Sequence, residues 1–385
     1  MKLTIDTGRL AEAAQWALRA VPQTPPAPVL AGLLIEARDD TLTLSGFDYY
    51  RSAGAREDCD IEEPGVVLVG GRVFTDLVKG FPKSRATTLV LDGSTLTLSC
   101  GTAHINLPTL PLDEYPALPP VPAPSGTVTG TVLADAATHV AAAASTDDTL
   151  PMLTGVQFAL GTDTLTLSAT DRYRFHVAEV PWTPAPARKG KRKTDPEPHT
   201  EGFSLVPADI LRDAARVLAD TDQAQITFTD GQFAVSVPGR WATGRVLDGR
   251  LPDYQFPTED DFESVVTVST EALADAIKHV QPLLGKSDPI VLDITGDRIT
   301  VRAGTDDKGR GSDQVPADLT GPTLDPAFNP GYFLQALQQV DAPHVQLNFA
   351  SPTKPCLLHA PDQAHIFKAL LMPIRVTPPS TGSES

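Results

Sequence analysis

Cysteine is scarce in this chain of 385 residues, which contains only three, Cys59, Cys100 and Cys356. The number is odd and no two of them are close in the sequence. This pattern argues against a disulfide framework and against a zinc site built from closely spaced cysteine pairs. We expect buried, reduced thiols, and we expect neither a metal nor a cofactor.

Long apolar runs are also missing, so no segment is expected to span a bilayer. Residues 1–6 alternate apolar and polar side chains like a strand, and they lack the apolar core of a signal peptide. The hydrophobic fraction of 41% is nevertheless sufficient for folded cores. The sequence therefore predicts a soluble, cytoplasmic protein with no membrane partner.

Familiar catalytic motifs are absent: there is no Gly-x-Ser-x-Gly elbow, no phosphate loop ending in Gly-Lys-Ser/Thr and no His-Glu-x-x-His. Ser168, Asp171 and His176 are close enough in the sequence to suggest a triad. They fall at one strand end, where successive side chains point in alternating directions. We therefore predict that the chain is not an enzyme, and we keep a hydrolase using Asp171 and His176 as an alternative to be tested.

Positive charge is in deficit, with 31 Lys and Arg against 48 Asp and Glu, a net charge of −17. Contacts with phosphates need Lys and Arg, so the total argues against a nucleic-acid partner. Net charge does not say where charges lie, however. Basic side chains gathered on one face would still allow DNA binding.

Three similar segments follow one another along the chain, each reading as a short helix followed by two strands. The helices are predicted over 10–17, 133–140 and 273–280. The strands that follow are predicted over 28–35 and 40–48, 151–158 and 163–171, and 289–294 and 297–305. Each segment then continues into a second helix, predicted over 73–78, 207–215 and 330–337. Three repeated units in one chain imply pseudo-symmetry.

The second helices are followed by further strands, over 88–99, over 225–237, and over 345–349 with 356–359. The first two of these read as hairpins that turn at Asp92-Gly93 and Asp230-Gly231. Two helices against one face of alternating strands give an α+β fold. The length suits two or three domains.

Domain boundaries are predicted in the proline-rich stretch 119–124 and the acidic stretch 258–263. The expected domains are 1–125, 126–260 and 261–376, followed by a disordered tail, 377–385. The middle domain contains a proline-flanked basic loop, 184–201, with the run Arg188 to Lys193. That run could bind DNA or a membrane surface, although a solvated charged loop is the simpler interpretation.

Several motifs together resemble those of one family, the bacterial DNA polymerase III β subunits, or replication sliding clamps. The resemblance covers residues 1–376. It is carried by Ala169-Thr-Asp-Arg-Tyr-Arg174, Leu251-Pro-Asp-Tyr254, Asn329-Pro-Gly-Tyr-Phe-Leu-Gln-Ala-Leu337, Ser351-Pro-Thr-Lys-Pro355 and Leu371-Met-Pro-Ile-Arg375. Each motif is weak alone, and their order over three units makes the match specific.

The resemblance implies a head-to-tail homodimer of three-domain clamp subunits that closes into a ring around duplex DNA, with helices lining the hole and sheets outside. DNA would be held through its phosphates without sequence preference. Basic residues on or near the candidate inner helices are Arg19, Lys79, Lys83, Arg212, Arg216 and Lys278. The implied dimer contact joins Arg72, Ile105 and Leu107 to Leu283 and Leu284 of the other copy. Ordinary core packing is an equally good interpretation of Leu107.

The resemblance also implies a pocket that binds a short peptide carried by the replicative polymerase, the clamp loader and repair proteins. Carried over by position, the pocket residues are Leu153, Thr170, Arg172, Tyr173, Arg174, Phe175, Pro252, Phe256, Pro257, Asn329, Tyr332, Met372, Pro373, Ile374 and Arg375. Apolar walls, aromatic anchors and a few polar groups suit peptide capture. Core packing is the alternative for Leu153, Phe175 and Met372 taken singly.

The sequence departs from the family pattern at two places in this set. Many members have Gly-His-Arg where this chain has Arg172-Tyr173-Arg174, and many carry a basic residue where it has Phe256. We expect a bulkier rim and an altered peptide preference, and we hypothesise a second, inhibitor-tolerant clamp copy. The alternative function is a peptide-binding α+β repeat protein that forms no ring.

Overall fold

The computed structural model describes residues 1–385 except 187–197, 220, 253, 286, 306–308 and 376–385. The basic run Arg188 to Lys193 and the predicted tail lie outside the described residues. The chain divides into two compact units. Unit 1 comprises residues 1–134, 160–163 and 181–247, and unit 2 comprises 135–159, 164–180 and 248–385.

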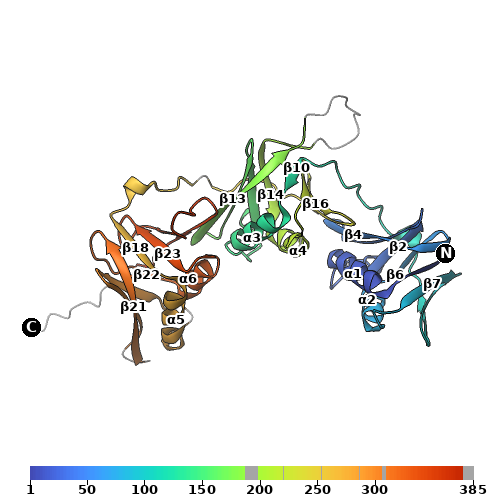
Figure 1. Cartoon of the computed structure of the whole chain (residues 1–385), viewed down its shortest axis with the longest axis horizontal. Coiled ribbons are helices and arrows are strands. Elements are labelled where there is room, and N and C mark those ends of the chain that lie inside the picture. The colour runs from blue at the N-terminus through green and yellow to red at the C-terminus, as the bar shows by residue number, and fades with distance from the viewer. Residues whose placement is uncertain (187–197, 220, 253, 286, 306–308, 376–385) are drawn as a thin grey trace, which may run out of the picture. The chain divides into compact units, whose positions relative to one another are not determined.

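Unit 1 alternates helices with antiparallel strands (Figure 1). Its elements are β1 (Lys2–Asp6), α1 (Thr7–Ala17), η1 (Leu18–Ala20), η2 (Pro28–Ala31), β2 (Gly32–Arg38), β3 (Thr41–Phe47), β4 (Arg51–Asp58), β5 (Asp60–Glu63), β6 (Gly65–Gly70), α2 (Gly71–Gly80), β7 (Ala86–Asp92), β8 (Thr95–Cys100), β9 (Ala103–Pro108), η3 (Leu112–Glu114), β10 (Gly126–Val128), β14 (Gly202–Pro207), α4 (Ala208–Leu218), β15 (Ala224–Phe228), β16 (Gln232–Val237) and β17 (Arg240–Arg245). Three elements have residues in both units: α3 (Gly130–Ala141), β11 (Gly155–Leu160) and β13 (Arg174–Pro184).

Unit 2 also alternates helices with antiparallel strands. They are η4 (Pro151–Thr154), β12 (Thr164–Thr170), η5 (Glu259–Asp261), β18 (Ser264–Ser269), α5 (Thr270–Val280), η6 (Gln281–Leu283), β19 (Ile290–Thr295), β20 (Arg298–Thr305), β21 (Gly309–Thr320), β22 (Ala327–Phe328), α6 (Pro330–Leu337), β23 (His344–Phe349), β24 (Cys356–His359) and β25 (Phe367–Leu371).

The sheets are antiparallel ladders. In unit 1 one sheet has the order β5-β1-β7-β8-β9. A second ladder runs β6-β2-β3-β4-β17-β16-β15-β10, so β4 of the first repeat pairs directly with β17 of the second. In unit 2 the ladder runs β13-β25-β24-β23-β18-β21. Strand β13 of the second repeat is therefore joined to β25 of the third.

The first helices of the repeats bury the same face. In α1 the buried residues Leu10, Ala13, Ala14 and Ala17 recur at helical spacing, and in α5 the buried positions are 273, 276, 277 and 280. Within unit 1, α1 packs against α2, and within unit 2, α5 packs against α6 (Figure 1). Their caps are side chains: Asp6 accepts from the Arg9 N–H and Ser269 from the Ala272 N–H.

The α+β fold class and the helices of all three repeats are confirmed. The hairpin turn at Asp92-Gly93 is also confirmed, and Gly93 adopts a φ of 53° there. The predicted strands at 28–35 and 151–158 are wrong at their first residues. Pro28 and Pro151 each begin a short 3₁₀ turn, because proline is preorganised for the first helical position.

The cysteines are unpaired. Cys100 and Cys356 are buried as predicted, but Cys59 is only half-buried. Desolvation, followed by the nearby charge of Asp40, raises the pKa of the Cys59 thiol to about 11. Within the described part of the chain, no helix combines the length and the apolar character needed to cross a membrane.

Candidate functional site

A small apolar cavity of about 190 Å³ lies within unit 2. Its wall residues come from η4, the β12–β13 turn, the segment after 250, the residue before β24, and the end of β25 with the residue that follows it. They are Leu153, Thr170, Arg172, Arg174, Phe175, Pro252, Tyr254, Pro355, Leu370 and Met372. Most of these positions were predicted from the sequence. The structure thus brings together residues that are more than 200 positions apart in the chain.

The turn at the edge of this apolar cavity is fixed by Asp171. Its Oδ1 accepts hydrogen bonds from the backbone N–H groups of Tyr173 and Arg174, and its Oδ2 accepts one from Nε of Arg174 at 3.0 Å. Thr170 adds a second tie, because its hydroxyl donates to the Arg174 carbonyl at 2.6 Å. Arg172 adopts a φ of 79°, a strained conformation for a residue with a side chain. The turn therefore presents Arg172 and Tyr173 in one defined conformation.

Arg174 is almost fully buried and connects this turn to helix α6. Its guanidinium lies 4.6 Å from the centroid of the Tyr332 ring and donates to the side-chain oxygen of Gln335. Tyr332 stacks on Tyr173 with centroids 6.1 Å apart. Desolvation, followed by the charge of Asp171, raises the pKa of the Tyr332 hydroxyl.

Asn329, which was predicted as a pocket residue, caps helix α6. It does not line the apolar cavity, and its side-chain oxygen accepts from the N–H groups of Gly331 and Tyr332 at 2.9 and 3.1 Å. The cap fixes the start of the helix that carries Tyr332. Asn329 is therefore a positioning residue.

The end of the described chain runs beside the turn. The Met372 N–H donates to the Tyr173 carbonyl at 2.9 Å, and the Ile374 N–H donates to the Ala327 carbonyl at 2.7 Å. The side chains of Tyr173, Met372 and Ile374 are all exposed, at 55%, 48% and 36%. Pro373 is half-buried and Arg375 is exposed. Exposed apolar side chains beside an apolar cavity mark a surface that binds a partner.

Phe256 and Pro257 also lie outside the apolar cavity. The Phe256 ring packs against Phe175 and Tyr254, with centroids 5.6 and 5.4 Å apart. Tyr254, Pro355 and Leu370 line the cavity but were missed. Tyr254 and Pro355 are the last residues of two motifs that carry the family resemblance, so the sequence could have identified them. For Leu370 the sequence shows only the alternation typical of a strand.

The hydrolase alternative finds no support in this geometry. His176 is fully buried, and its Nδ1 lies 2.9 Å from the His139 carbonyl oxygen. Desolvation lowers the pKa of His176 to about 4. The Asp171 carboxylate is engaged by Arg174, and among the described residues no hydrogen bond joins Asp171 to His176. Nor do the described residues hold a cluster of three or more His, Cys, Asp or Glu suited to a metal ion.

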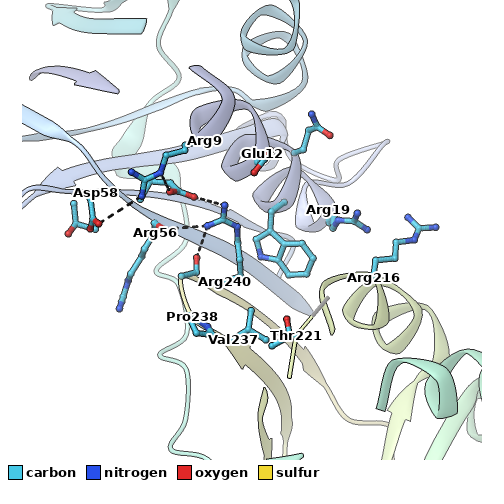
Figure 2. Close-up of a pocket in the computed structure, with 15 residues that line it drawn as sticks. Arg9, Glu12, Arg19, Arg56, Asp58, Arg216, Thr221, Val237, Pro238 and Arg240 are labelled. Carbon is cyan, nitrogen blue, oxygen red and sulfur yellow. Dashed lines mark hydrogen bonds and ion pairs between the residues drawn. The ribbon is translucent and has the colours of Figure 1, made fainter. Parts of the chain in front are cut away.

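A larger cavity of about 890 Å³ lies within unit 1 and is lined by five arginines (Figure 2). They come from separate elements and are Arg9, Arg19, Arg56, Arg216 and Arg240. Three acids, Glu12, Glu57 and Asp58, share this cationic cavity. Positive charge is therefore concentrated locally in a chain whose total charge is strongly negative.

Two carboxylates organise these arginines. Glu57, which is 8% exposed, accepts from Nε of Arg9 at 2.8 Å and from Nη2 of Arg240 at 2.5 Å. Asp213 lies 3.2 Å from Nη1 of Arg19 and 3.8 Å from Nη1 of Arg216. Arg56 is exposed and stacks over the ring of Trp241 at 5.2 Å.

The other residues predicted to face DNA are not part of the cationic cavity. Lys79, Lys83 and Arg212 are exposed, and Lys278 pairs with Asp275 at 2.9 Å. Of the residues predicted at the dimer contact, Arg72 is exposed, while Ile105, Leu283 and Leu284 are half-buried. Leu107 is 8% exposed and belongs to the core of unit 1, as its alternative interpretation expected. Strand β9, which carries Ile105 and Leu107, is the last strand of its sheet.

Comparison with known proteins gives consistent matches along the chain. Models of the N-terminal, central and C-terminal domains of the DNA polymerase III beta subunit match residues 1–119, 127–253 and 255–375. The beta sliding clamp of Streptomyces coelicolor is 39% identical over 98% of this chain and 100% of its own length. The crystal structure of the DNA polymerase sliding clamp from Bacillus subtilis superposes with a TM-score of 0.88 at 24% identity, covering 98% of this chain and all of that one. A Pseudomonas aeruginosa clamp bound to griselimycin has the same TM-score, 0.88, at 21% identity, with 98% of this chain and 100% of that chain covered.

Proposed function

The chain belongs to the DNA polymerase III beta subunit family, and on that premise we propose that it is a sliding clamp. It encircles duplex DNA as a homodimeric ring and tethers the replicative polymerase and other proteins by a peptide. It is a processivity factor and has no catalytic role of its own. Bond chemistry belongs to the polymerase.

The observation that carries this proposal is the apolar cavity of unit 2 with its exposed rim. Tyr173, Met372 and Ile374 offer apolar surface to a partner, and the cavity beside them takes a buried side chain. Few polar groups line it, so burial of apolar area dominates the binding energy. Arg172, which lines the cavity and is exposed, orients the peptide backbone or an acidic residue. Among the predicted pocket residues outside the cavity, Phe256 packs against Phe175 of its wall, and Tyr332 stacks on Tyr173 of its rim.

The cationic cavity of unit 1 supplies a contact with DNA. Five arginines from separate elements provide charge without a pattern of base-reading groups, which suits phosphates. Arg19 and Arg216 belong to this site. Sequence-independent attraction allows the DNA to move through the ring.

The remaining features are part of the same proposal. The domains span 1–125, 126–260 and 261–376, and the dimer contact joins Arg72, Ile105 and Leu107 to Leu283 and Leu284 of a second copy. The protein acts in the cytoplasm and needs no cofactor. The idea of a second, inhibitor-tolerant copy rests on Arg172, Tyr173 and Phe256, and is tested by titrating an inhibitor against an ordinary clamp.

The ring is tested by loading the protein onto nicked circular and linear DNA with a clamp loader. Retention on circles and loss from linear ends is expected. If the protein is instead a monomer at micromolar concentration and is never retained on circles, the ring is excluded. The alternative function, a peptide-binding repeat protein that forms no ring, then remains.

The pocket is tested with a fluorescent peptide carrying the clamp-binding segment of the cognate polymerase. Tyr173→Ala should weaken binding about tenfold or more, as expected for a central aromatic anchor. Tyr50→Ala is the matched control, because Tyr50 occupies the same turn in the first repeat and is 66% exposed. It should bind the peptide as wild type does.

A further inference from the structure

A second cavity of unit 2 measures about 660 Å³; it includes Phe256 and Pro257 of the predicted pocket set but shares no lining residue with the apolar cavity. We name it the annex cavity. Phe256, Phe262, Val265 and Leu357 form its apolar walls. Lys368, Asp362 and His365 carry the polar groups at its rim.

The annex cavity follows the apolar cavity along the same two strands. On β25, Leu370 lines the apolar cavity and Lys368 lines the annex. Pro355, just before β24, lines the apolar cavity, and Leu357, within β24, lines the annex. Residues two apart in a strand lie on one face, roughly 7 Å apart. Both cavities therefore open on the same face of the sheet, and along each strand their lining residues are two positions apart.

A single aromatic wall separates the two cavities. Phe175 lines the apolar cavity, Phe256 lines the annex, and their rings meet edge to face with centroids 5.6 Å apart. Tyr254 packs on both rings, at 5.7 and 5.4 Å. Phe256 thus forms part of the boundary between the two cavities.

Three polar residues that line the annex are joined by hydrogen bonds; Asn348 and His359 are buried, and Gln346 is half-buried. The Gln346 amide donates to Oδ1 of Asn348 at 3.0 Å, and Nδ2 of Asn348 lies 2.9 Å from Nε2 of His359. Nδ1 of His359 lies 2.8 Å from the Ala360 carbonyl, so this nitrogen carries the proton and Nε2 accepts. Gln346 is the first residue of this hydrogen-bonded chain. Its side-chain oxygen can accept an N–H from the backbone of a peptide that lies in the cavity.

Lys368 supplies a positive charge to the annex cavity. Its Nζ lies 4.9 Å from the centroid of the Phe256 ring, and no carboxylate of the described residues lies within 4 Å of it. A cation held over an aromatic ring beside an apolar cavity suits a ligand with an apolar side chain next to a carboxylate.

We propose that the annex cavity binds an extension of the same partner peptide whose core occupies the apolar cavity, with one aromatic or branched apolar residue next to one acidic residue. This inference rests on the proposed function. Two anchors on one extended segment bind more tightly than one, because the second contact forms within the same complex.

The experiment compares a minimal polymerase peptide with the same peptide extended, at either end, by three residues that include Phe and Asp. We expect one extended peptide to bind at least tenfold more tightly to the full chain. Phe262→Ala and Lys368→Ala should remove that increase and leave the affinity of the minimal peptide unchanged. Tyr173→Ala should weaken both peptides by the same factor.

A charge exchange isolates the role of Lys368. Replacing Asp of the extension by Lys should abolish the increase in affinity with the wild-type protein, and Lys368→Glu should restore it. If neither extended peptide binds more tightly while the minimal peptide binds, the inference fails and the proposed function stands. If the minimal peptide does not bind either, the proposed function fails as well.

Discussion

The carboxylate of Asp171 accepts a hydrogen bond from Nε of Arg174 at 3.0 Å and holds the turn between them. Asp48 and Arg51 form the same arrangement in the first repeat at 2.9 Å, with Oδ1 of Asp48 also accepting the N–H groups of Tyr50 and Arg51. Tyr49 and Arg172 both have positive φ, of 75° and 79°. One local motif is therefore used twice, and in unit 2 it adjoins the apolar cavity.

Asp171→Asn should weaken binding of the polymerase peptide about tenfold, which corresponds to about 1.4 kcal/mol. The substitution removes the charge that holds Arg174 and loosens the turn that presents Arg172 and Tyr173. Fluorescence anisotropy with a labelled peptide measures the change. Asp48→Asn is the control, because it disturbs the same motif in unit 1. Equal loss in the two variants would show that the effect comes from general destabilisation.

The local elements of the fold follow directly from the sequence. Residues at i, i+3, i+4 and i+7 set the buried faces of α1 and α5, and Asp-Gly pairs set the hairpin turns. The 3₁₀ turns at Pro28 and Pro151 were missed because the apolar residues that follow, Val29 and Leu30 in the first repeat, read equally well as the start of a strand.

Contacts between distant segments were less accessible to sequence reasoning. The ladder that joins β13 to β25 brings Phe175 opposite Leu370, nearly 200 residues away, and nothing local specifies that register. Asn329 was placed in the pocket by its position in the family resemblance, and only the structure shows that its hydrogen bonds form a helix cap. The arginines of the cationic cavity come from five elements, so only the folded structure shows that they line one cavity.

Asp213→Asn should strengthen binding of duplex DNA severalfold at low salt. Asp213 neutralises Arg19 and Arg216, and its loss leaves both guanidinium groups available to phosphates. The dependence of log K on log salt should steepen by about 0.9 for each additional phosphate that these arginines neutralise. Filter binding or anisotropy over a salt series measures both quantities.

Glu62→Gln is the control for Asp213→Asn, because it changes the net charge equally. Glu62 pairs with Lys2 and lies outside the cationic cavity. An equal increase in DNA affinity for this variant would assign the effect to net charge alone.

His176 should make the folded state less stable as the pH falls from 6.5 towards 4. Desolvation lowers its pKa to about 4 from 6.5, and its Nε2 has no partner among the described residues. Below pH 6.5 the unfolded chain binds a proton that the folded chain does not, so the free energy of unfolding decreases by up to about 1.4 kcal/mol per pH unit. Above pH 6.5 this contribution is complete and constant.

Urea unfolding at pH 7.5 and pH 5.0 tests this expectation. His176 should account for about 2 kcal/mol of the stability that the wild type loses between the two, and His176→Gln should lose measurably less. The lowered pKa of His139 acts in the same direction and remains in both proteins. Identical pH dependence in the two proteins would contradict the role assigned to His176.

Gly54→Ala should destabilise the pairing of β4 with β17. Gly54 lies opposite Trp241 in the ladder, and a Cβ at this position would lie 1.9 Å from Cζ2 of the indole. The Trp241 carbonyl accepts from Nε1 of Trp16 at 3.0 Å, which fixes the backbone that carries the indole, and the Arg56 guanidinium packs over the ring. Overpacking of this kind costs about 1–3 kcal/mol, which calorimetry should detect as a lower Tm. Gly231→Ala is the matched control, because nothing lies within 4 Å of its Cβ position; equal Tm values for the two variants would mean that the close approach of Gly54 and Trp241 does not exist in solution.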